Sequence, residues 1–273
     1  MKKQSKTIFI LSITSDIGSF IARQYLSRGW RVIGTYRTKS QAADSLKAQG
    51  CELFHCDLAD KKSITKFIQD YKRLRSPWDV FISCAGDLLP AKAFFDCGFD
   101  DWAQSVEANS LQQLRVLHGL FVQRRKGKTP RVVFFAGGGM NGAVVNLSAY
   151  TASKIFLTKM CEFLDAENKD MSIFIVGPGF TRTKIHDQIL KGKAVARVKL
   201  KSTRRDLKEK EGTALKDIFE CIDWLIHVDK KLVSGRNFSV AFDPWKSNPK
   251  KLLKALKSDR DMYRLRRNKN DSK

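Results

Sequence analysis

A tyrosine and a lysine four residues apart carry the most chemistry in this chain of 273 residues. Tyr150 and Lys154 follow an apolar strand over 132–135 and three consecutive glycines, and Ser148 or Asn146 can cap the helix that holds the pair. Residues four apart share one helical face, so the phenol and the ammonium point into the same space. A neighbouring ammonium favours phenolate and lowers the pKa of a tyrosine. Although such spacing is common on helix surfaces, this pair could exchange a proton with a carbonyl or alcohol oxygen.

A strand, a turn, a helix and a second strand open the chain over residues 7–36. A unit of this kind, about 30 residues long, binds dinucleotides with the phosphates at the helix N-terminus. Only Gly18 remains of the usual three glycines, because Ser12 and Asp16 stand at the first two positions. An acid beside a pyrophosphate is unfavourable unless its side chain points away. The predicted phosphate-loop contacts are Ser12, Thr14, Ser15, Asp16, Ile17 and Gly18.

The end of the second strand indicates which dinucleotide would bind. An acid about 20 residues beyond the glycine turn binds the ribose hydroxyls of NAD, whereas a basic residue accommodates the 2′-phosphate of NADP. Arg37 and Lys39 stand here, and residues 37–41 contain no acid. NADP is therefore favoured over NAD, the alternative being that the two cations are simply exposed in a loop.

Strands and helices alternate along the rest of the chain. Further apolar strands are expected near 51–55, 78–82, 132–135, 171–176 and 237–241. This alternation predicts an α/β fold, a single doubly wound Rossmann-type parallel sheet of about seven strands with helices on both faces. The predicted domain covers residues 1–244, within which 182–210 form a basic lid over the site. Residues 245–273 form a basic tail.

The positive charge of the chain is concentrated in these last two segments. Residues 182–210 and 245–273 each hold eleven Lys or Arg and three acids, so together they carry +16 of the net charge of +23. Clustered cations raise the local concentration of anionic partners. A solvated surface is the alternative interpretation, especially for the tail.

The cysteines and the apolar runs indicate the compartment. The six cysteines include no C-x-x-C pair, which favours reduced thiols in a cytoplasmic protein and predicts neither disulfides nor a zinc site. We expect no bound metal, and no apolar run is long enough for a signal peptide or a transmembrane helix.

Taken together, these motifs resemble the short-chain dehydrogenase/reductase family over roughly residues 6–243. Tyr150 and Lys154 resemble its Tyr-x-x-x-Lys pair. Asn109, in an apolar helix over 100–124, resembles the asparagine that holds a water in the family's proton relay. The resemblance implies that Tyr150, Lys154 and Asn109 are catalytic and that the first two also contact the cofactor. It further implies cofactor contacts at Asp57, Leu58, Ala85, Gly86, Pro178, Gly179 and Thr183.

One departure from the family pattern concerns catalysis directly. The family's catalytic serine stands 13 or 14 residues before the tyrosine, where this chain has Ala136-Gly137. We place the missing hydroxyl at Ala136. Losing one preorganised hydrogen-bond donor typically costs about 100- to 1,000-fold in rate, or roughly 3–4 kcal/mol. Asn141, Asn146 or Ser148 could reach in as a substitute.

The leading hypothesis is an NADP-dependent oxidoreductase that interconverts a carbonyl and an alcohol on a small anionic substrate. The cationic lid offers the candidate substrate contacts Arg182, Lys184, Arg204 and Arg205. Residues 234–245 and 263–267 resemble a bacterial subgroup found in surface-polysaccharide gene clusters, which implies a sugar or nucleotide-sugar. The alternative is a catalytically impaired nucleotide-binding sensor or scaffold.

Two further expectations concern macromolecular partners. Helices over 100–124 and 149–166 resemble the family's usual dimer face, so a homodimer or homotetramer is expected. Specific nucleic-acid binding is disfavoured, because the basic runs contain few aromatic residues and no known DNA- or RNA-reading motif.

Overall fold

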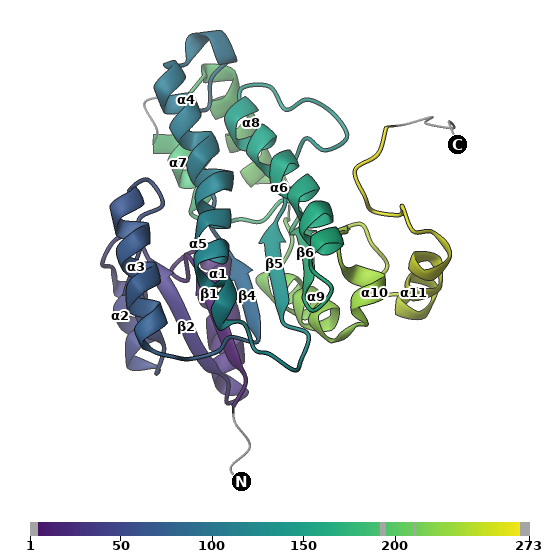
Figure 1. Ribbon diagram of the computed structural model, residues 1–273. Coiled ribbons are helices and arrows are strands. Elements are labelled where there is room, and N and C mark those ends of the chain that lie inside the picture. Colours follow the sequence, from purple (N-terminus) through teal and green to yellow (C-terminus); the bar gives the residue numbers. More distant parts are fainter. Residues whose placement is uncertain (1–4, 192–194, 210, 268–273) are drawn as a thin grey trace.

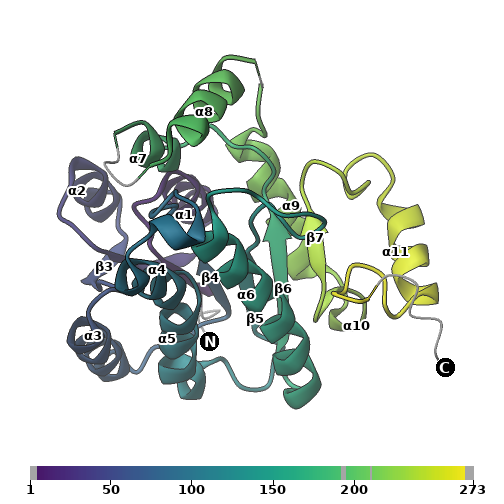
Figure 2. The same ribbon diagram turned by 90° about the horizontal axis from the view of Figure 1, so that it is seen from above.

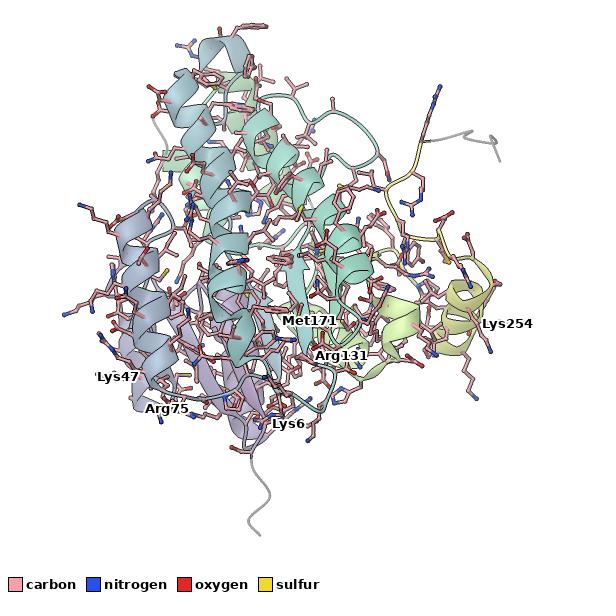
Figure 3. The ribbon with its side chains drawn as sticks, viewed as in Figure 1. Lys6, Lys47, Arg75, Arg131, Met171 and Lys254 are labelled. Atoms are coloured by element: carbon pink, nitrogen blue, oxygen red, sulfur yellow. The ribbon has the colours of Figure 1, made fainter. Side chains whose placement is uncertain are left out.

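Seven parallel strands form one sheet in the order β3-β2-β1-β4-β5-β6-β7 in the computed structural model, which describes residues 5–191, 195–209 and 211–267. This confirms the predicted doubly wound α/β fold. The strands are β1 (Thr7–Leu11), β2 (Arg31–Tyr36), β3 (Glu52–His55), β4 (Val80–Ser83), β5 (Arg131–Phe135), β6 (Ser172–Gly177) and β7 (Asn237–Ser239). Lys6, Arg131 and Met171, which stand at the amino ends of three strands, lie toward the same end of the sheet (Figure 3).

Helices cover both faces of the sheet, because the strands are apolar on both sides. One face packs against α1 (Asp16–Ser27), α2 (Gln41–Ala48) and α9 (Leu215–His227). The other packs against α3 (Lys61–Arg73), α5 (Gln112–Leu120) and α6 (Ser148–Glu167). The view along the sheet in Figure 2 shows the two layers of helices on either side of it.

The long helix expected over 100–124 is interrupted in its middle. It consists of α4 (Phe99–Val106), a π-helical turn over Glu107–Leu111, α5, and a short 3₁₀ turn over Phe121–Gln123. Asn109 lies inside the π-helical turn and is almost fully buried. Such turns are rare and frequently mark functional sites, because they re-aim side chains from a helix.

The basic segment after β6 forms two helices above the carboxyl ends of the strands. These helices are α7 (Ile185–Lys191) and α8 (Arg197–Glu209), and they lie with α4 at the top of the molecule in Figure 1. We use the name lid for residues 182–191 and 195–209. Residues 192–194 and 210 of the predicted lid lie outside the described residues.

The described part of the tail packs against its own chain. After the short α10 (Lys230–Val233) and β7, helix α11 (Pro249–Ser258) places Leu252 and Leu256 in the hydrophobic cluster that covers one face of the sheet. The buried guanidinium of Arg236 donates hydrogen bonds to three main-chain carbonyls at the end of α11, those of Leu256, Asp259 and Met262. Lys254 lies on the outer side of this helix (Figure 3). The domain boundary at 244/245 stays a prediction.

Candidate active site

A cavity of about 1300 Å³ lies between the carboxyl ends of the strands and the lid. This is the position at which open α/β sheets bind ligands, and the volume exceeds that of most small-molecule sites. Fifteen of the predicted catalytic and cofactor-binding residues line it: Ser12, Thr14, Ser15, Asp16, Ile17, Arg37, Asp57, Leu58, Ala85, Gly86, Asn109, Tyr150, Pro178, Gly179 and Thr183.

The phosphate loop is built without the usual first glycine. Ser12 has a φ of 59°, the left-handed conformation that a glycine adopts most easily. The Ser15 hydroxyl oxygen accepts a hydrogen bond from the Gly18 amide at 3.1 Å and caps α1. Gly18 is required by packing, since a Cβ there would lie 2.8 Å from the Ser12 carbonyl oxygen. The loop therefore has the tight turn of a dinucleotide site with one glycine instead of three.

Asp16 points away from the phosphate loop and toward the lid. Its Oδ2 accepts a hydrogen bond from the Lys184 main-chain amide at 2.6 Å, and its Oδ1 lies 3.6 Å from Lys184 Nζ. The lysine reduces the repulsion between this carboxylate and a bound pyrophosphate. This contact joins residues 168 apart in the sequence, so local sequence could not predict it.

Asp87 is a site residue that the sequence analysis missed. Its carboxylate lies 3.9 Å from Arg37 Nη1 and accepts a hydrogen bond from Gln188 of the lid at 3.4 Å. It therefore connects the predicted 2′-phosphate cation with α7. The only signal in the sequence was its position directly after Gly86, at the end of the fourth strand.

The three predicted catalytic groups meet at the turn over residues 85–87. Lys154 Nζ donates a hydrogen bond to the Ala85 carbonyl oxygen at 3.2 Å, and it lies 5.6 Å from the centre of the Tyr150 ring. The Asn109 side chain holds both main-chain groups of Asp87, accepting from its amide and donating to its carbonyl at 2.8 Å each. Asn109 thus braces the turn that Lys154 contacts.

Burial changes the pKa values of both groups in the predicted proton-transfer pair. It raises the pKa of Tyr150 to about 12, because the charged phenolate loses its solvation. This is opposite to the predicted lowering by Lys154. Burial also lowers the pKa of Lys154 to about 8, so the lysine is itself poorly solvated and does not outweigh the desolvation of the phenol.

Gly137, rather than Ala136, is the residue that faces Tyr150 where the family has its catalytic serine. A Cβ at Gly137 would lie 2.6 Å from Tyr150 Cε1 and 3.0 Å from Lys154 Cγ. Ala136 lines the cavity too, and it also belongs to the hydrophobic cluster beneath α6. We infer that the serine position corresponds to Gly137 rather than Ala136, because the tyrosine ring occupies the space that a side chain at 137 would need.

The suggested substitutes for the serine lie in different places. Asn141 lines the cavity, whereas Asn146 is half-buried and does not line it. The Ser148 hydroxyl oxygen accepts a hydrogen bond from Trp102 Nε1 at 3.0 Å, outside the cavity lining. Asn141 is thus the one of the three that the structure brings to the site.

The predicted substrate cations are scattered across the lid. Lys184 lines the main cavity, and Arg182 lines a second recess of about 640 Å³ between the lid and α1. Arg204 and Arg205 are exposed on α8 and line neither recess. The structure therefore does not gather the four cations around one ligand.

The fold is a Rossmann-type α/β fold with a cavity at the carboxyl ends of its strands, and comparison with known proteins identifies its family. Residues 6–194 match the short chain dehydrogenase family. This match covers more than half of the chain, which therefore belongs to that family of oxidoreductases acting on carbonyl and alcohol groups. The resemblance to the family is confirmed, whereas nothing in the comparisons supports a link to polysaccharide gene clusters.

Individual relatives are distant and chemically varied. A serine 3-dehydrogenase of Agrobacterium fabrum is 26% identical over 197 residues, covering 66% of this chain and 74% of the relative. An acetoacetyl-CoA reductase of an Acinetobacter species is 24% identical over 190 residues, covering 66% and 76%. These names do not converge on one substrate.

Solved structures share the fold at low identity. A short chain dehydrogenase/reductase from Saccharomyces cerevisiae has a TM-score of 0.77 at 18% identity, covering 88% of this chain and 97% of that one. A short chain dehydrogenase from Shigella flexneri, complexed with NADP, has a TM-score of 0.73 at 19% identity, covering 86% and 97%.

Introducing a serine at Gly137 should destabilise the folded protein. Because its Cβ would overlap the Tyr150 ring, we expect Gly137→Ser to lower the free energy of unfolding by about 1–3 kcal/mol, the usual cost of overpacking. Urea unfolding measures this. Gly138→Ser is the matched control, since a Cβ there meets only Val144 Cγ2 at 3.9 Å. Equal stability of the two variants would contradict the packing described.

The lowered pKa of Lys154 predicts a pH-dependent stability. Between about 8 and 10.5 the unfolded chain holds a lysine proton that the folded protein has released. The contribution of Lys154 to the free energy of unfolding is therefore full above 10.5 and is lost as the pH falls through 8. In urea unfolding, the stability of the wild type minus that of Lys154→Met should increase across this window as pH rises. A constant difference would refute the shift.

Proposed function

We propose that this chain is an NADP(H)-dependent oxidoreductase in which Tyr150 exchanges a proton with the substrate oxygen. The observation that carries the proposal is the convergence of Tyr150, Lys154 and Asn109 on the turn over 85–87, at the edge of a cavity that a dinucleotide can occupy. Three polar groups from two helices, held at one turn, are the arrangement that positioned proton transfer requires.

The cavity residues fit an NADP molecule laid across the carboxyl ends of the strands. The phosphate loop and the N-terminus of α1 would hold the pyrophosphate, and Arg37 would pair with the 2′-phosphate in place of Asp87. Asp57 would receive the adenine, and Pro178, Gly179 and Thr183 would adjoin the nicotinamide. A solved relative from Shigella flexneri binds NADP at this fold, which supports the choice of cofactor.

Tyr150 would act as the proton donor when a carbonyl group is reduced. The nicotinamide supplies the hydride, and the chain supplies the proton and the orientation. A phenol with a pKa of about 12 is protonated at neutral pH, so Tyr150 is ready to donate to the oxygen of a carbonyl group. Lys154, with a pKa of about 8, is mostly charged there and stabilises the phenolate that donation leaves.

A nucleotide-binding protein without turnover is the second candidate, and Gly137 is the observation that favours it. The residue facing Tyr150 there has no side chain that could donate to a substrate oxygen. An enzyme lacking one such donor typically retains measurable activity, about 100- to 1,000-fold reduced. Slow NADPH oxidation coupled to a carbonyl would therefore favour the enzyme over the sensor.

Two finer predictions stay predictions. An anionic sugar or nucleotide-sugar substrate has little support from the four scattered lid cations. A homodimer or homotetramer is consistent with large apolar side chains on the exposed sides of the predicted dimer helices, namely Leu111, Phe156 and Phe163. Among the described residues, no helix has the length and hydrophobicity needed to span a membrane.

Tyr150→Phe should abolish turnover while NADPH still binds. The change removes only the hydroxyl, so proton transfer is lost and the cavity keeps its shape. We expect NADPH oxidation with a reactive ketone to fall at least about 100-fold, as for loss of a general acid, with the dissociation constant for NADPH within threefold of wild type. Spectrophotometry and fluorescence titration measure these two quantities. Turnover that survives in the variant would assign the proton to another group.

Arg37→Ala should weaken NADPH binding and leave NADH binding unchanged, because only NADPH carries the 2′-phosphate. An arginine–phosphate pair is a charge-assisted interaction, and we expect at least a tenfold rise in the NADPH dissociation constant. Lys39→Ala is the matched control, since Lys39 is exposed in the same loop and does not line the cavity. Equal losses for both cofactors would place the 2′-phosphate elsewhere.

A further inference from the structure

The cavity is acidic, although the chain as a whole is strongly basic. Among the described residues that line it, five are aspartates and three are lysines or arginines, in a chain with a net charge of +23. The aspartates are Asp16, Asp57, Asp87, Asp101 and Asp206, and the cations are Arg37, Lys184 and Lys199. The positive charge of the protein therefore lies on its outer surface rather than around the ligand.

The cavity cations are already engaged by protein groups. Arg37 lies against Asp87, Lys184 lies against Asp16, and Lys199 is also engaged in an interaction. Burial lowers the pKa of His186, which favours its neutral form. A bound NADP would add further negative charge. Because Arg37 and Lys184 are paired with carboxylates, they offer an anionic substrate little attraction.

The walls around Tyr150 are apolar and come from three separate segments. Its ring belongs to a hydrophobic cluster with pairs of side chains from the loop after β4, from the loop before α6 and from α7 of the lid. These pairs are Leu88 and Leu89, Val144 and Leu147, and Ile185 and Ile189, all of which line the cavity.

Gly86 shows how close these walls come to the reacting group. A Cβ at Gly86 would lie 3.7 Å from Ile185 Cδ1 and 3.9 Å from Tyr150 Cε2. The lid isoleucine and the tyrosine ring therefore flank the same turn. A substrate carbon beside the Tyr150 hydroxyl would meet aliphatic side chains from the lid and from both loops.

We propose that the substrate is a neutral carbonyl compound, or its alcohol, with an aliphatic body next to the reacting carbon. This proposal rests on the function proposed above and adds the substrate class. Aliphatic walls stabilise such a body by removing apolar surface from water. Aliphatic walls next to Tyr150 would leave a carboxylate, a phosphate or a sugar hydroxyl there without a polar partner, which disfavours such a group beside the reacting carbon.

A matched pair of ketones tests the substrate class. Octan-2-one and 7-oxooctanoate present the same methyl ketone on the same chain and differ only at the far end, which is a methyl group in one and a carboxylate in the other. With NADPH, we expect kcat/KM for octan-2-one to exceed that for 7-oxooctanoate at least tenfold, the discrimination that an apolar pocket commonly achieves. Equal values, or a preference for the carboxylate, would overturn the proposal.

Two neighbouring valines give a matched pair of variants. Val144 lines the cavity, whereas Val145 is 73% exposed and does not. Val144→Lys should lower kcat/KM for octan-2-one at least tenfold and narrow or invert the preference between the two ketones, because it places a cation beside the aliphatic chain. Val145→Lys should leave both values within twofold. The dissociation constant for NADPH should stay unchanged in both variants.

Failure of this proposal is distinguishable from failure of the proposed function. If the NADPH complex turns over neither ketone, binding of each to that complex is measured by calorimetry. Preferential binding of octan-2-one would support the proposed apolar site for a neutral ligand, although the protein would not be an enzyme for these ketones. Preferential binding of 7-oxooctanoate, or turnover of a keto sugar such as fructose in preference to octan-2-one, would reject it.

Discussion

The turn that follows β4 is the constraint on which the site depends. The Ala85 carbonyl oxygen accepts a hydrogen bond from the Lys154 ammonium on α6. The Asn109 side chain, in the π-helical turn, accepts a hydrogen bond from the Asp87 amide and donates one to the Asp87 carbonyl. These contacts join two helices to one turn, so main-chain groups fix the positions of the Asn109 and Lys154 side chains. The same turn carries Gly86, against which Tyr150 and the lid approach closely.

Burial near this turn changes the pKa values of Tyr150 and Lys154. Lys154 is almost fully buried and Tyr150 is partly buried at the cavity wall, so the pKa of the phenol is raised and that of the lysine is lowered. A protonated phenol matches the needs of carbonyl reduction. The absence of a side chain at Gly137 has a complementary effect, because the tyrosine ring can lie deeper in the protein than a serine there would permit.

Much of the fold and the list of cavity residues could be predicted from the sequence, because both depend on local pattern. Apolar strands that alternate with helices determine a doubly wound sheet, and residues that follow the carboxyl ends of parallel strands gather at one edge. Local pattern could not show that Ser12 adopts the left-handed backbone conformation in place of a glycine. Nor could residue counting decide between positions 136 and 137, since that depends on which side chain faces Tyr150.

The charge interactions in the site could not be predicted, because they join residues that are far apart in the sequence. Asp16 contacts Lys184 of the lid, and Asp87 contacts both Arg37 and Gln188. The distribution of charge along the sequence identified the two basic segments. It could not show that most of their cations lie outside the cavity, whose charged lining residues are five aspartates and three cations. The pKa of Tyr150 is raised rather than lowered because of burial, which depends on the fold and could not be predicted from the spacing of Tyr150 and Lys154.

A crystal structure of the protein with NADPH tests the central claim most directly. The account predicts the adenosine 2′-phosphate beside Arg37 and the reduced nicotinamide against Gly86, with its C4 facing the space next to the Tyr150 hydroxyl. A cavity that stays empty at saturating NADPH, or a nicotinamide directed away from Tyr150, would contradict it.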